Sequence, residues 1–469
     1  MRTILFLSYC FLSILFLCTP GLSSAGLISV DLAGNTLTVT AVNTPLQNIL
    51  RELAAEGITV KIDPAINPSV SATFTARPME QGLETLLKPA SYSLLWEEAT
   101  LDSGGTFIRL AEIQVFQSGR KKHMKPLPPA RQTVITKNDE GVYHVRGEII
   151  LQLPSGMSRK ELLDVIEAYG GILVEISGAG NLVKVLLPVN SDVFAISRVI
   201  KKILGLEIAQ PNYAYPMQPP VYYKGGKSPA VLDAGAYDPA DKRAAIAILD
   251  SGMAQNSSLE RLVLSSRDIT NPDQPLTDTL GHGTQMAFIA SGLVKPYGAE
   301  YTTGSPLPII PIRTFDDNGF TTDLNIMAAV DFALENNARV LSLSWGSETR
   351  SDFLEKTFAA ASNRGLVIVA SAGNEPTGRP VYPAAYPAVI GVGALEPHGK
   401  HWENSNHGDF VALYAPGFAT LPVGHRGDPG LYAGTSISAA FTANVIAGYL
   451  SENPAATMQE IQAYIEKRF

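Results

Sequence analysis

The chain has 469 residues, of which 45% are hydrophobic and 17% charged, and its formal net charge is −8. A chain of this length usually forms two to four domains, and its apolar content excludes wholesale disorder. The negative charge argues against a nucleic-acid-binding protein, which usually carries a basic face.

Residues 1–25 have the composition of a secretory signal peptide. Arg2 precedes an apolar run from Ile4 to Leu17, and small residues lead to Ala25. The run is shorter than the roughly 20 residues that a spanning helix needs, so we expect cleavage after Ala25. An uncleaved anchor is the alternative. The expected location is secreted or periplasmic.

Both cysteines, Cys10 and Cys18, lie in this signal segment. The mature chain would therefore contain no thiol, no disulfide and no cysteine-bound zinc. No later segment is long and apolar enough to span a bilayer, so no membrane span is expected after signal removal.

Residues 27–115 are predicted to form a small α+β domain. Leucine and isoleucine recur at helical spacing over 46–53 and leucine over 83–87, and stretches such as LTVTAV alternate as half-buried strands do. The pattern resembles the short N-terminal domain of secretins and TonB-dependent receptors. That resemblance implies an envelope partner for this domain.

Residues 116–140, which include SGRKKHMKPLPPARQ, are basic and then proline-rich, which is typical of an extended linker. A docking patch or a protease-sensitive site at the lysines is the alternative. Residues 141–216 follow with the pattern strand–helix–strand–strand–helix–strand, which predicts a ferredoxin-like α+β module.

Residues 231–469 alternate between strand and helix patterns. AAIAIL, VLSLSW, LVIVASA and AVIGVGA are continuous apolar runs, as expected for parallel strands covered on both faces. The predicted fold class is α/β, with a doubly wound, mostly parallel sheet preceded by two small α+β domains.

Four polar residues of this region stand where strands end or helices begin. Asp250 follows AAIAIL, His282 opens GHGTQMAFIASG, Ser436 opens the helical stretch SISAAFTANVIAGYL, and Asn374 follows VIVASAG. Peptide hydrolysis by serine needs a hydroxyl, an imidazole, a buried carboxylate and an oxyanion donor, which these residue types supply. Singly, each has a simpler interpretation as a strand-end or helix cap.

Together, these segments resemble the subtilisin family of serine proteases, whose chain order is Asp, His, Ser. The resemblance implies an exported serine endopeptidase in which Asp250 orients His282, His282 is the base and acid, Ser436 is the nucleophile and Asn374 binds the oxyanion. An extended peptide or protein substrate would contact Ser344, Trp345, Gly346, Ala372, Gly373 and Glu375. Glu375 would favour a basic side chain.

The sequence departs from the family at three positions. Gln285 replaces a second histidine, Ala440 replaces a proline, and Phe441 stands where histidine is frequent. The family's calcium loop has no recognisable counterpart, so no cofactor and no obligatory metal are expected. The histidines of HGKHWENSNHG are interpreted as a surface loop, with a metal site as the alternative.

Residues 141–216 also resemble the propeptide of subtilases, most clearly in AQPNYAY. The resemblance implies a zymogen whose propeptide aids folding and inhibits the enzyme within the same chain. Residues 217–230 are the expected processing linker, with self-cleavage between Tyr215 and Ser228. The alternative function is a catalytically impaired binding or envelope assembly protein that keeps the fold.

Overall fold

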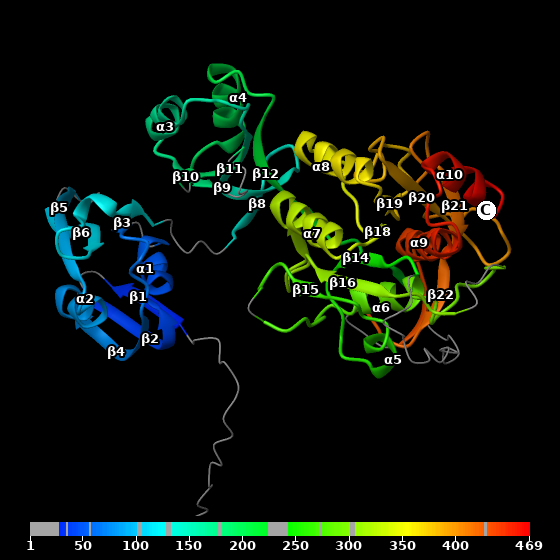
Figure 1. The fold of residues 1–469 in the computed structure, drawn as a ribbon, viewed down its shortest axis with the longest axis horizontal. Helices are drawn as coiled ribbons and strands as arrows, with labels where there is room; N and C mark the ends of the chain where they lie inside the picture. The colour runs from blue at the N-terminus through cyan, green and yellow to red at the C-terminus, as the bar shows by residue number, and fades with distance from the viewer. Residues whose placement is uncertain are drawn as a thin grey trace, which may run out of the picture. The chain divides into compact units, whose positions relative to one another are not determined.

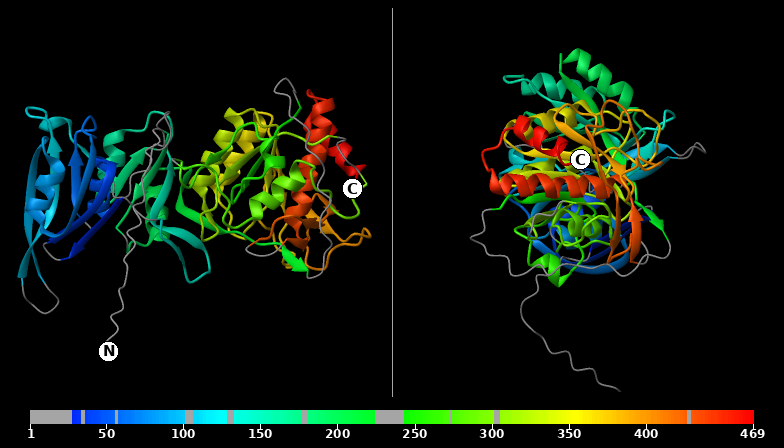
Figure 2. Two further views of the ribbon diagram at one scale, coloured as in Figure 1. Left: turned by 90° about the horizontal axis from the view of Figure 1, so that it is seen from below. Right: turned by 90° about the vertical axis from the view of Figure 1, so that its right-hand side faces the viewer.

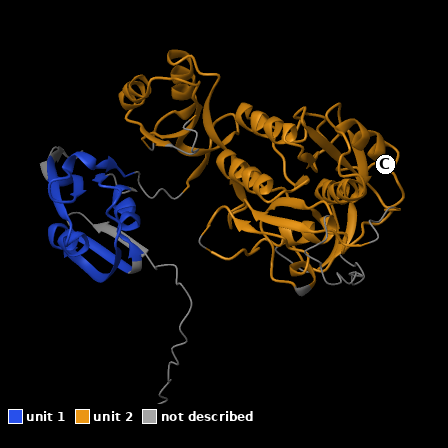
Figure 3. Ribbon diagram, viewed as in Figure 1, with its two compact units in different colours: residues 1–130 blue, residues 131–469 orange. Residues whose placement is uncertain are grey.

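The computed structural model describes residues 28–33, 36–55, 58–100, 106–127, 133–175, 181–188, 190–223, 243–272, 274–300, 305–425 and 429–469. The predicted signal peptide and both cysteines lie outside these residues. The chain divides into two compact units, residues 1–130 and 131–469, which are described separately (Figure 3).

The first unit packs two helices against two sheets. One sheet has the order β1-β2-β4 and the other β5-β6-β3-β7. The helices bury their leucine faces, as the spacing predicts, and Leu50 and Leu83 are fully buried. The elements are β1 (Ile28–Ala33), β2 (Thr36–Pro45), α1 (Leu46–Ala55), β3 (Thr59–Ile62), β4 (Ser69–Pro78), α2 (Met79–Leu87), β5 (Ser91–Thr100), β6 (Thr106–Phe116) and β7 (Lys125–Pro126).

The stretch expected to be a linker, residues 116–140, contains a short 3-10 helix (Lys121–His123) and two short strands. β7 pairs antiparallel with β3, and Leu127 beside it is buried. β8 (Ile135–Lys137) pairs with a strand of the second unit. Proline at the end of a short edge strand is tolerated because no ladder donor is lost there. The basic stretch therefore belongs partly to the first unit.

Residues 141–216, here called the ferredoxin-like module, have the element order that the sequence predicts. Their antiparallel strands follow the order β10-β11-β9-β12, with α3 and α4 packed against the sheet. Ser158 and Asp192 cap the two helices. The elements are β9 (Tyr143–Gln152), α3 (Arg159–Ala168), β10 (Ile172–Glu175), β11 (Leu182–Leu186), α4 (Val193–Ile203) and β12 (Ile208–Pro216).

Residues 243–469, here called the α/β module, contain a seven-stranded sheet of order β15-β16-β14-β18-β19-β20-β21 in which every pair is parallel (Figures 1 and 2). This confirms the predicted fold class. The strands are β14 (Ile246–Asp250), β15 (Arg267–Asp268), β16 (Ile309–Arg313), β18 (Val340–Leu343), β19 (Val367–Ser371), β20 (Val389–Leu395) and β21 (Leu413–Pro416).

Helices cover both faces of this sheet. One buried cluster joins it to α6 (His282–Ala290), α9 (Thr435–Glu452) and α10 (Met458–Glu466), and the other joins it to α7 (Asp323–Glu335) and α8 (Asp352–Asn363). A four-residue helix, α5 (Ser257–Glu260), lies between β14 and β15 in the chain. Within the described residues, no helix is long and apolar enough to cross a membrane.

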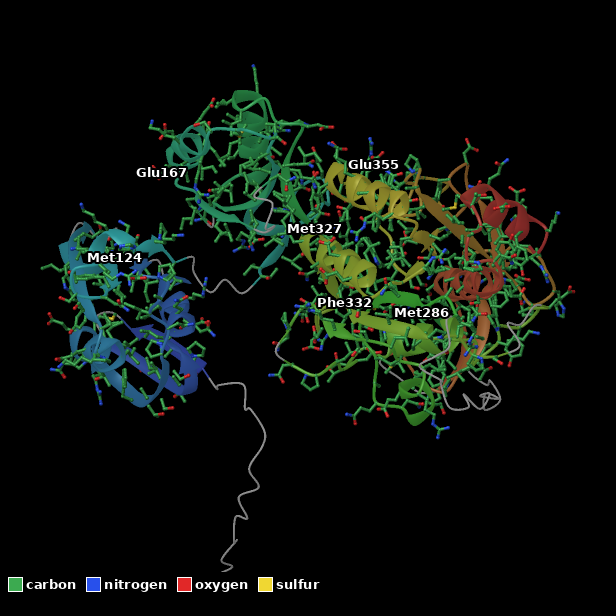
Figure 4. All side chains as sticks on the ribbon, in the orientation of Figure 1. Met124, Glu167, Met286, Met327, Phe332 and Glu355 are labelled. Carbon is green, nitrogen blue, oxygen red and sulfur yellow. The ribbon has the colours of Figure 1, made fainter. Side chains whose placement is uncertain are left out.

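The ferredoxin-like module packs against the face that carries α7 and α8. Its Ile150 and Ile208 share a buried cluster with Ile326 and Phe353 of those helices. Met327 of α7 and Gln152 of β9 line one small cavity at this contact, and Figure 4 labels Met327 there. β12 continues the module's sheet into β17 (Phe320–Thr322), a strand of the α/β module.

A three-stranded sheet joins the segment before the α/β module to two strands of that module. β13 (Val221–Tyr223) pairs with β23 (Gly430–Ala433), which pairs with β22 (Phe418–Leu421). β23 leads directly into α9, so this sheet lies beside Ser436 in the chain.

Candidate active site

Asp250 and His282 form a buried hydrogen-bonded pair. Asp250 is the last residue of β14 and His282 the first of α6, and their Oδ1 and Nδ1 atoms are 2.7 Å apart. Both side chains are almost completely buried. Gly281 precedes α6 with φ of 81°, and a side chain there would meet the Gly424 carbonyl, so only glycine suits this turn.

A second carboxylate braces this pair. Asp278 accepts hydrogen bonds from Ser251 Oγ at 2.8 Å, from Gly281 N at 2.7 Å and from Thr284 N at 2.8 Å. Ser251 N in turn donates to Asp250 Oδ1 at 2.8 Å. Asp278 therefore ties the end of β14 to the first turn of α6.

The electrostatic surroundings of His282 favour its charged form. Burial alone would lower its pKa, but the attraction of Asp250, the hydrogen bond to Asp250 and the charge of Asp278 outweigh burial and raise the pKa of His282 above its ordinary value. A base of raised pKa is well placed to accept a proton from a hydroxyl.

Ser436 lies in the first turn of α9, which packs against α6. Asn444 Nδ2 of α9 donates to the Ala290 carbonyl of α6 at 2.8 Å, which fixes one helix on the other. Ser436 Oγ and His282 Nε2 are both buried, and within the described residues neither has a hydrogen-bond partner. The Asp–His half of the expected relay is therefore formed, and the His–Ser hydrogen bond is not.

The side-chain amide of Asn374 is oriented by the residue before Ser436. Asn374 Oδ1 accepts from both the backbone N and the Oγ1 of Thr435, each at 2.9 Å. This fixes the flip of the amide, and Nδ2 makes a long contact of 3.5 Å with the Pro219 carbonyl. A Cβ added at Gly434 would lie 3.0 Å from Ser436 Oγ and 3.5 Å from Asn374 Nδ2, so both groups border the side of Gly434 on which a side chain would stand.

A cavity of about 440 Å³ adjoins these groups. Gly346, Gly373 and Glu375 line it, together with Gln218 and Tyr143 from outside the α/β module. Glu140 and Glu348 also line it, so its rim is acidic. This wall brings the two expected substrate-binding segments, around 344–346 and 372–375, to one place.

Three other expected substrate-binding residues are buried. Ser344 and Ala372 lie at the ends of neighbouring strands β18 and β19, and the Trp345 ring packs against Tyr215 with centroids 5.2 Å apart. Within the described strand pairings, β12, which precedes the α/β module in the chain, pairs with β17 and not with residues 344–346. Pro216, which lines the cavity beside Gly346, has no N–H to donate.

Two of the three departures from the family pattern, Gln285 and Phe441, have specific contacts. Gln285 Nε2 donates to the Val423 carbonyl at 2.9 Å, and Phe441 packs edge-on against Phe469. His398, His401 and His407 are exposed, and His401 stacks on Tyr414. In the described part of the chain, no group of three His, Cys, Asp or Glu side chains is arranged to hold a metal.

Sequence reasoning missed Asp278, Thr435 and Asp323. Asp278 sits four residues before His282 and gives a weak signal, since an acidic residue just before a helix is common. Thr435 directly precedes the predicted nucleophile Ser436 at the start of the same helix, so that prediction could have pointed to it. Asp323 gives no signal, because the tyrosine that donates a hydrogen bond to its buried carboxyl group, Tyr215, lies 108 positions earlier in the chain.

Comparison with known proteins identifies the family. The subtilase family model matches residues 241–468. The chain is 27% identical over 302 residues to the thermophilic serine proteinase of Bacillus sp. (strain AK1), covering 62% of this chain and 74% of that protein. It is 30% identical over 227 residues to thermitase of Thermoactinomyces vulgaris, covering 48% of this chain and 80% of thermitase.

A solved structure supports the fold. The crystal structure of fervidolysin from Fervidobacterium pennivorans, a keratinolytic enzyme related to subtilisin, matches with a TM-score of 0.55 and 23% identity. The match covers 69% of this chain and 57% of the fervidolysin chain. With the pair Asp250–His282, the oriented amide of Asn374 and these matches, the chain belongs to the subtilase family of serine endopeptidases.

Proposed function

We propose that this protein is an exported serine endopeptidase made as a zymogen. Ser436 attacks the peptide carbonyl, His282 takes the proton and returns it to the leaving nitrogen, and Asp250 holds His282 in the required tautomer. Asn374 Nδ2 donates to the oxyanion. The observation that carries the proposal is the buried 2.7 Å contact between His282 and Asp250. Within the described residues it leaves His282 Nε2 without a hydrogen-bond partner, on the helix α6 that packs against α9.

This chemistry assigns each role to a side chain, so it uses no cofactor. Its substrates are peptides or proteins bound in extended form, with the cavity beside Gly346 and Gly373 receiving one side chain. The acidic rim, which includes Glu375, favours a basic side chain. Incubation with a metal chelator is expected to leave the hydrolysis rate unchanged.

Labelling with a serine-directed fluorophosphonate tests the proposal. The activated wild-type protein is expected to react and to hydrolyse casein, whereas Ser436→Ala does neither, with a loss of about 10⁶-fold in kcat. Ser438→Ala is the matched control, because Ser438 lies on the same helix and its Oγ donates to the Ala415 carbonyl. Equal labelling of wild type and Ser436→Ala would contradict the proposal.

The ferredoxin-like module is proposed to be the propeptide, acting as an inhibitor within its own chain. Two contacts support this. β12 pairs with β17 at the edge of the site, and Gln210 Nε2 donates to Ser351 Oγ at the start of α8. N-terminal sequencing of the purified mature form tests the removal of both the signal peptide and the module. A mature protein that begins at residue 26 would contradict propeptide removal.

A catalytically impaired binding protein is the second candidate. The missing His282–Ser436 hydrogen bond and the departure at Gln285 favour it. A fully processed protein that binds denatured casein without labelling or cleaving it would support this candidate.

The first unit is proposed to resemble secretin and TonB-receptor N-terminal domains and to dock on an envelope partner. Its separate core supports an independent role. Deleting residues 27–115 is expected to leave hydrolysis intact. Loss of hydrolysis together with retained folding would contradict this division of labour.

A further inference from the structure

A short segment, residues 217–223, passes across the candidate active site and is called the strap here. Upstream, β12 pairs antiparallel with β17, and Met217 N donates to the Gly319 carbonyl at 2.8 Å. Downstream, β13 pairs antiparallel with β23, with Val221 opposite Ala433. The strap is therefore held by backbone pairing on both sides of Ser436.

The middle of the strap lies against the catalytic groups. The Pro219 carbonyl accepts from Asn374 Nδ2 in a long contact of 3.5 Å. Pro220 is buried, and its Cβ lies 3.3 Å from the point that a Cβ on Gly434 would occupy, which is 3.0 Å from Ser436 Oγ. The strap thus lies beside Ser436 and Asn374, the two groups that would act on a substrate carbonyl under the proposed function.

Two registers of the strap are compatible with these contacts. In the first register, the carbonyl that contacts Asn374 is the one that Ser436 would attack. This carbonyl belongs to Pro219, so the bond in question is Pro219–Pro220. In the second register, the residue whose side chain enters the cavity precedes the bond that Ser436 would attack. The Gln218 side chain reaches the cavity wall near Gly373, so the bond in question is Gln218–Pro219. In either register the leaving nitrogen belongs to a proline.

Hydrolysis of such a bond faces a specific obstacle. Ser436 Oγ would form a bond to the carbonyl carbon, the C–N bond would break, and the proton from Oγ would pass through His282 to the leaving nitrogen. A proline nitrogen carries the ring carbon Cδ where other residues carry hydrogen. His282 must then deliver its proton to a nitrogen that the ring crowds, inside a buried site.

We propose that Pro219 and Pro220 make the strap an inhibitor that Ser436 does not hydrolyse. Two consecutive prolines protect both registers, so the ferredoxin-like module stays joined across the cleft until a bond other than these two is cut. This rests on the proposed function, because it takes Ser436 as the nucleophile. Self-cleavage is expected between Tyr215 and Ser228. The inference excludes two bonds of that range, Gln218–Pro219 and Pro219–Pro220, which lie at the nucleophile.

The test uses the full chain with Pro219→Ala, Pro220→Ala and the double substitution, each with and without Ser436→Ala. Cleavage at the bonds 218–219 and 219–220 is followed by intact mass spectrometry and N-terminal sequencing. We expect the double variant to be cut at one of these bonds roughly 10²–10⁴-fold faster than wild type, the usual contribution of a working general acid. The single variants identify the register, because each frees one bond.

Two controls accompany the variants. Pro216→Ala keeps both prolines at the nucleophile and is expected to stay intact at these bonds. Ser436→Ala is expected to abolish the new cleavage in every background. Fluorophosphonate labelling of the samples that keep Ser436, after activation, reports whether each proline variant is folded around this residue.

The outcomes separate the two proposals. Wild-type protein cut at either bond as fast as the double variant would overturn the proline inference, and so would a labelled double variant that stays intact at both bonds. Absence of labelling and hydrolysis in every activated form would overturn the proposed function itself.

Discussion

The phenol of Tyr215 donates a hydrogen bond of 2.6 Å to Asp323 Oδ1, joining the last strand of the ferredoxin-like module to the first residue of α7. Gln210 Nε2 and Ser351 Oγ donate to Asp323 Oδ2 at 2.8 and 3.1 Å. All four side chains are buried. The module therefore binds the α/β module through a satisfied polar network as well as through apolar packing.

Tyr215→Phe is expected to loosen the module without unfolding the protein. The variant loses one hydrogen bond to a buried carboxyl group and leaves Asp323 with one donor fewer, at a cost of about 1–3 kcal/mol. Hydrogen exchange of the amides in β12 and β17, measured in the Ser436→Ala background, should become roughly 10–100-fold faster. Tyr213→Phe is the control, because Tyr213 is only partly buried. Equal exchange in both variants would contradict the role of this contact.

The association of the module is expected to weaken as pH rises toward neutrality. Burial raises the pKa of Asp323 from 3.8 to about 7, against hydrogen bonds from Tyr215, Ser351 and Gln210 that lower it. The folded state then binds a proton more tightly than the unfolded state, so this contribution is fully present below pH 3.8 and is lost as pH rises through about 7.

Asp323→Asn removes that titration and keeps the shape of the side chain. Thermal unfolding of full-length wild-type and variant proteins between pH 4 and 8 measures it. The difference in Tm between the two should change across this window and become constant above it. A difference that is independent of pH would show that Asp323 does not titrate there.

Asp278→Asn is expected to move the acidic limb of the kcat/KM profile to lower pH. His282, the proposed base, can accept a proton only when it is neutral, and its pKa is raised partly by the charge of Asp278. Removing that charge lets His282 lose its proton at lower pH. Asp317→Asn, which changes an exposed carboxylate paired with Arg313, is the control. An acidic limb that stays in place would contradict the electrostatic role of Asp278.

Asn374→Ala is expected to lower kcat of the activated enzyme by about 10²–10³-fold with little change in KM. Its Nδ2 is aimed by Thr435, and removing it leaves the oxyanion without that donor. Hydrolysis of a short chromogenic peptide measures both constants. A change confined to KM would show that Asn374 binds substrate without stabilising the transition state.

Glu375→Gln is expected to reduce selectivity for lysine or arginine over leucine by about 2–5-fold, as befits an exposed charge. Peptides that differ only in the residue entering the cavity measure this. Glu466→Gln, on α10 and absent from the cavity lining, is the control. Equal selectivity in both variants would assign the preference to other groups.

The sheet of the α/β module was predictable because its central strands are continuous apolar runs. Residues 246–250 and 367–371 are buried at every position, as parallel strands covered by helices must be. The positions of Asp250 and His282 followed, since each stands at the boundary of a strongly patterned element. The strands and the positions of these two residues can therefore be predicted from the local sequence.

The contacts between the two modules could not be predicted in the same way. Phe320–Thr322 form a strand because β12 lies beside them, and their own sequence has no alternating pattern. Asp323 looks like an ordinary acidic residue in the first turn of a helix. Its buried network requires Tyr215 and Gln210, which are distant in the chain, so only the folded structure reveals it.

The pairing of β12 with β17 has a consequence for the choice of targets. If the module is removed as proposed, β17 loses β12, its strand partner among the described residues, and its main-chain donors and acceptors become free to pair with another extended chain. Only a polypeptide that can straighten over several residues can replace those lost bonds. Compactly folded proteins keep such stretches engaged in their own secondary structure, so we expect frayed, damaged or denatured chains to be degraded first.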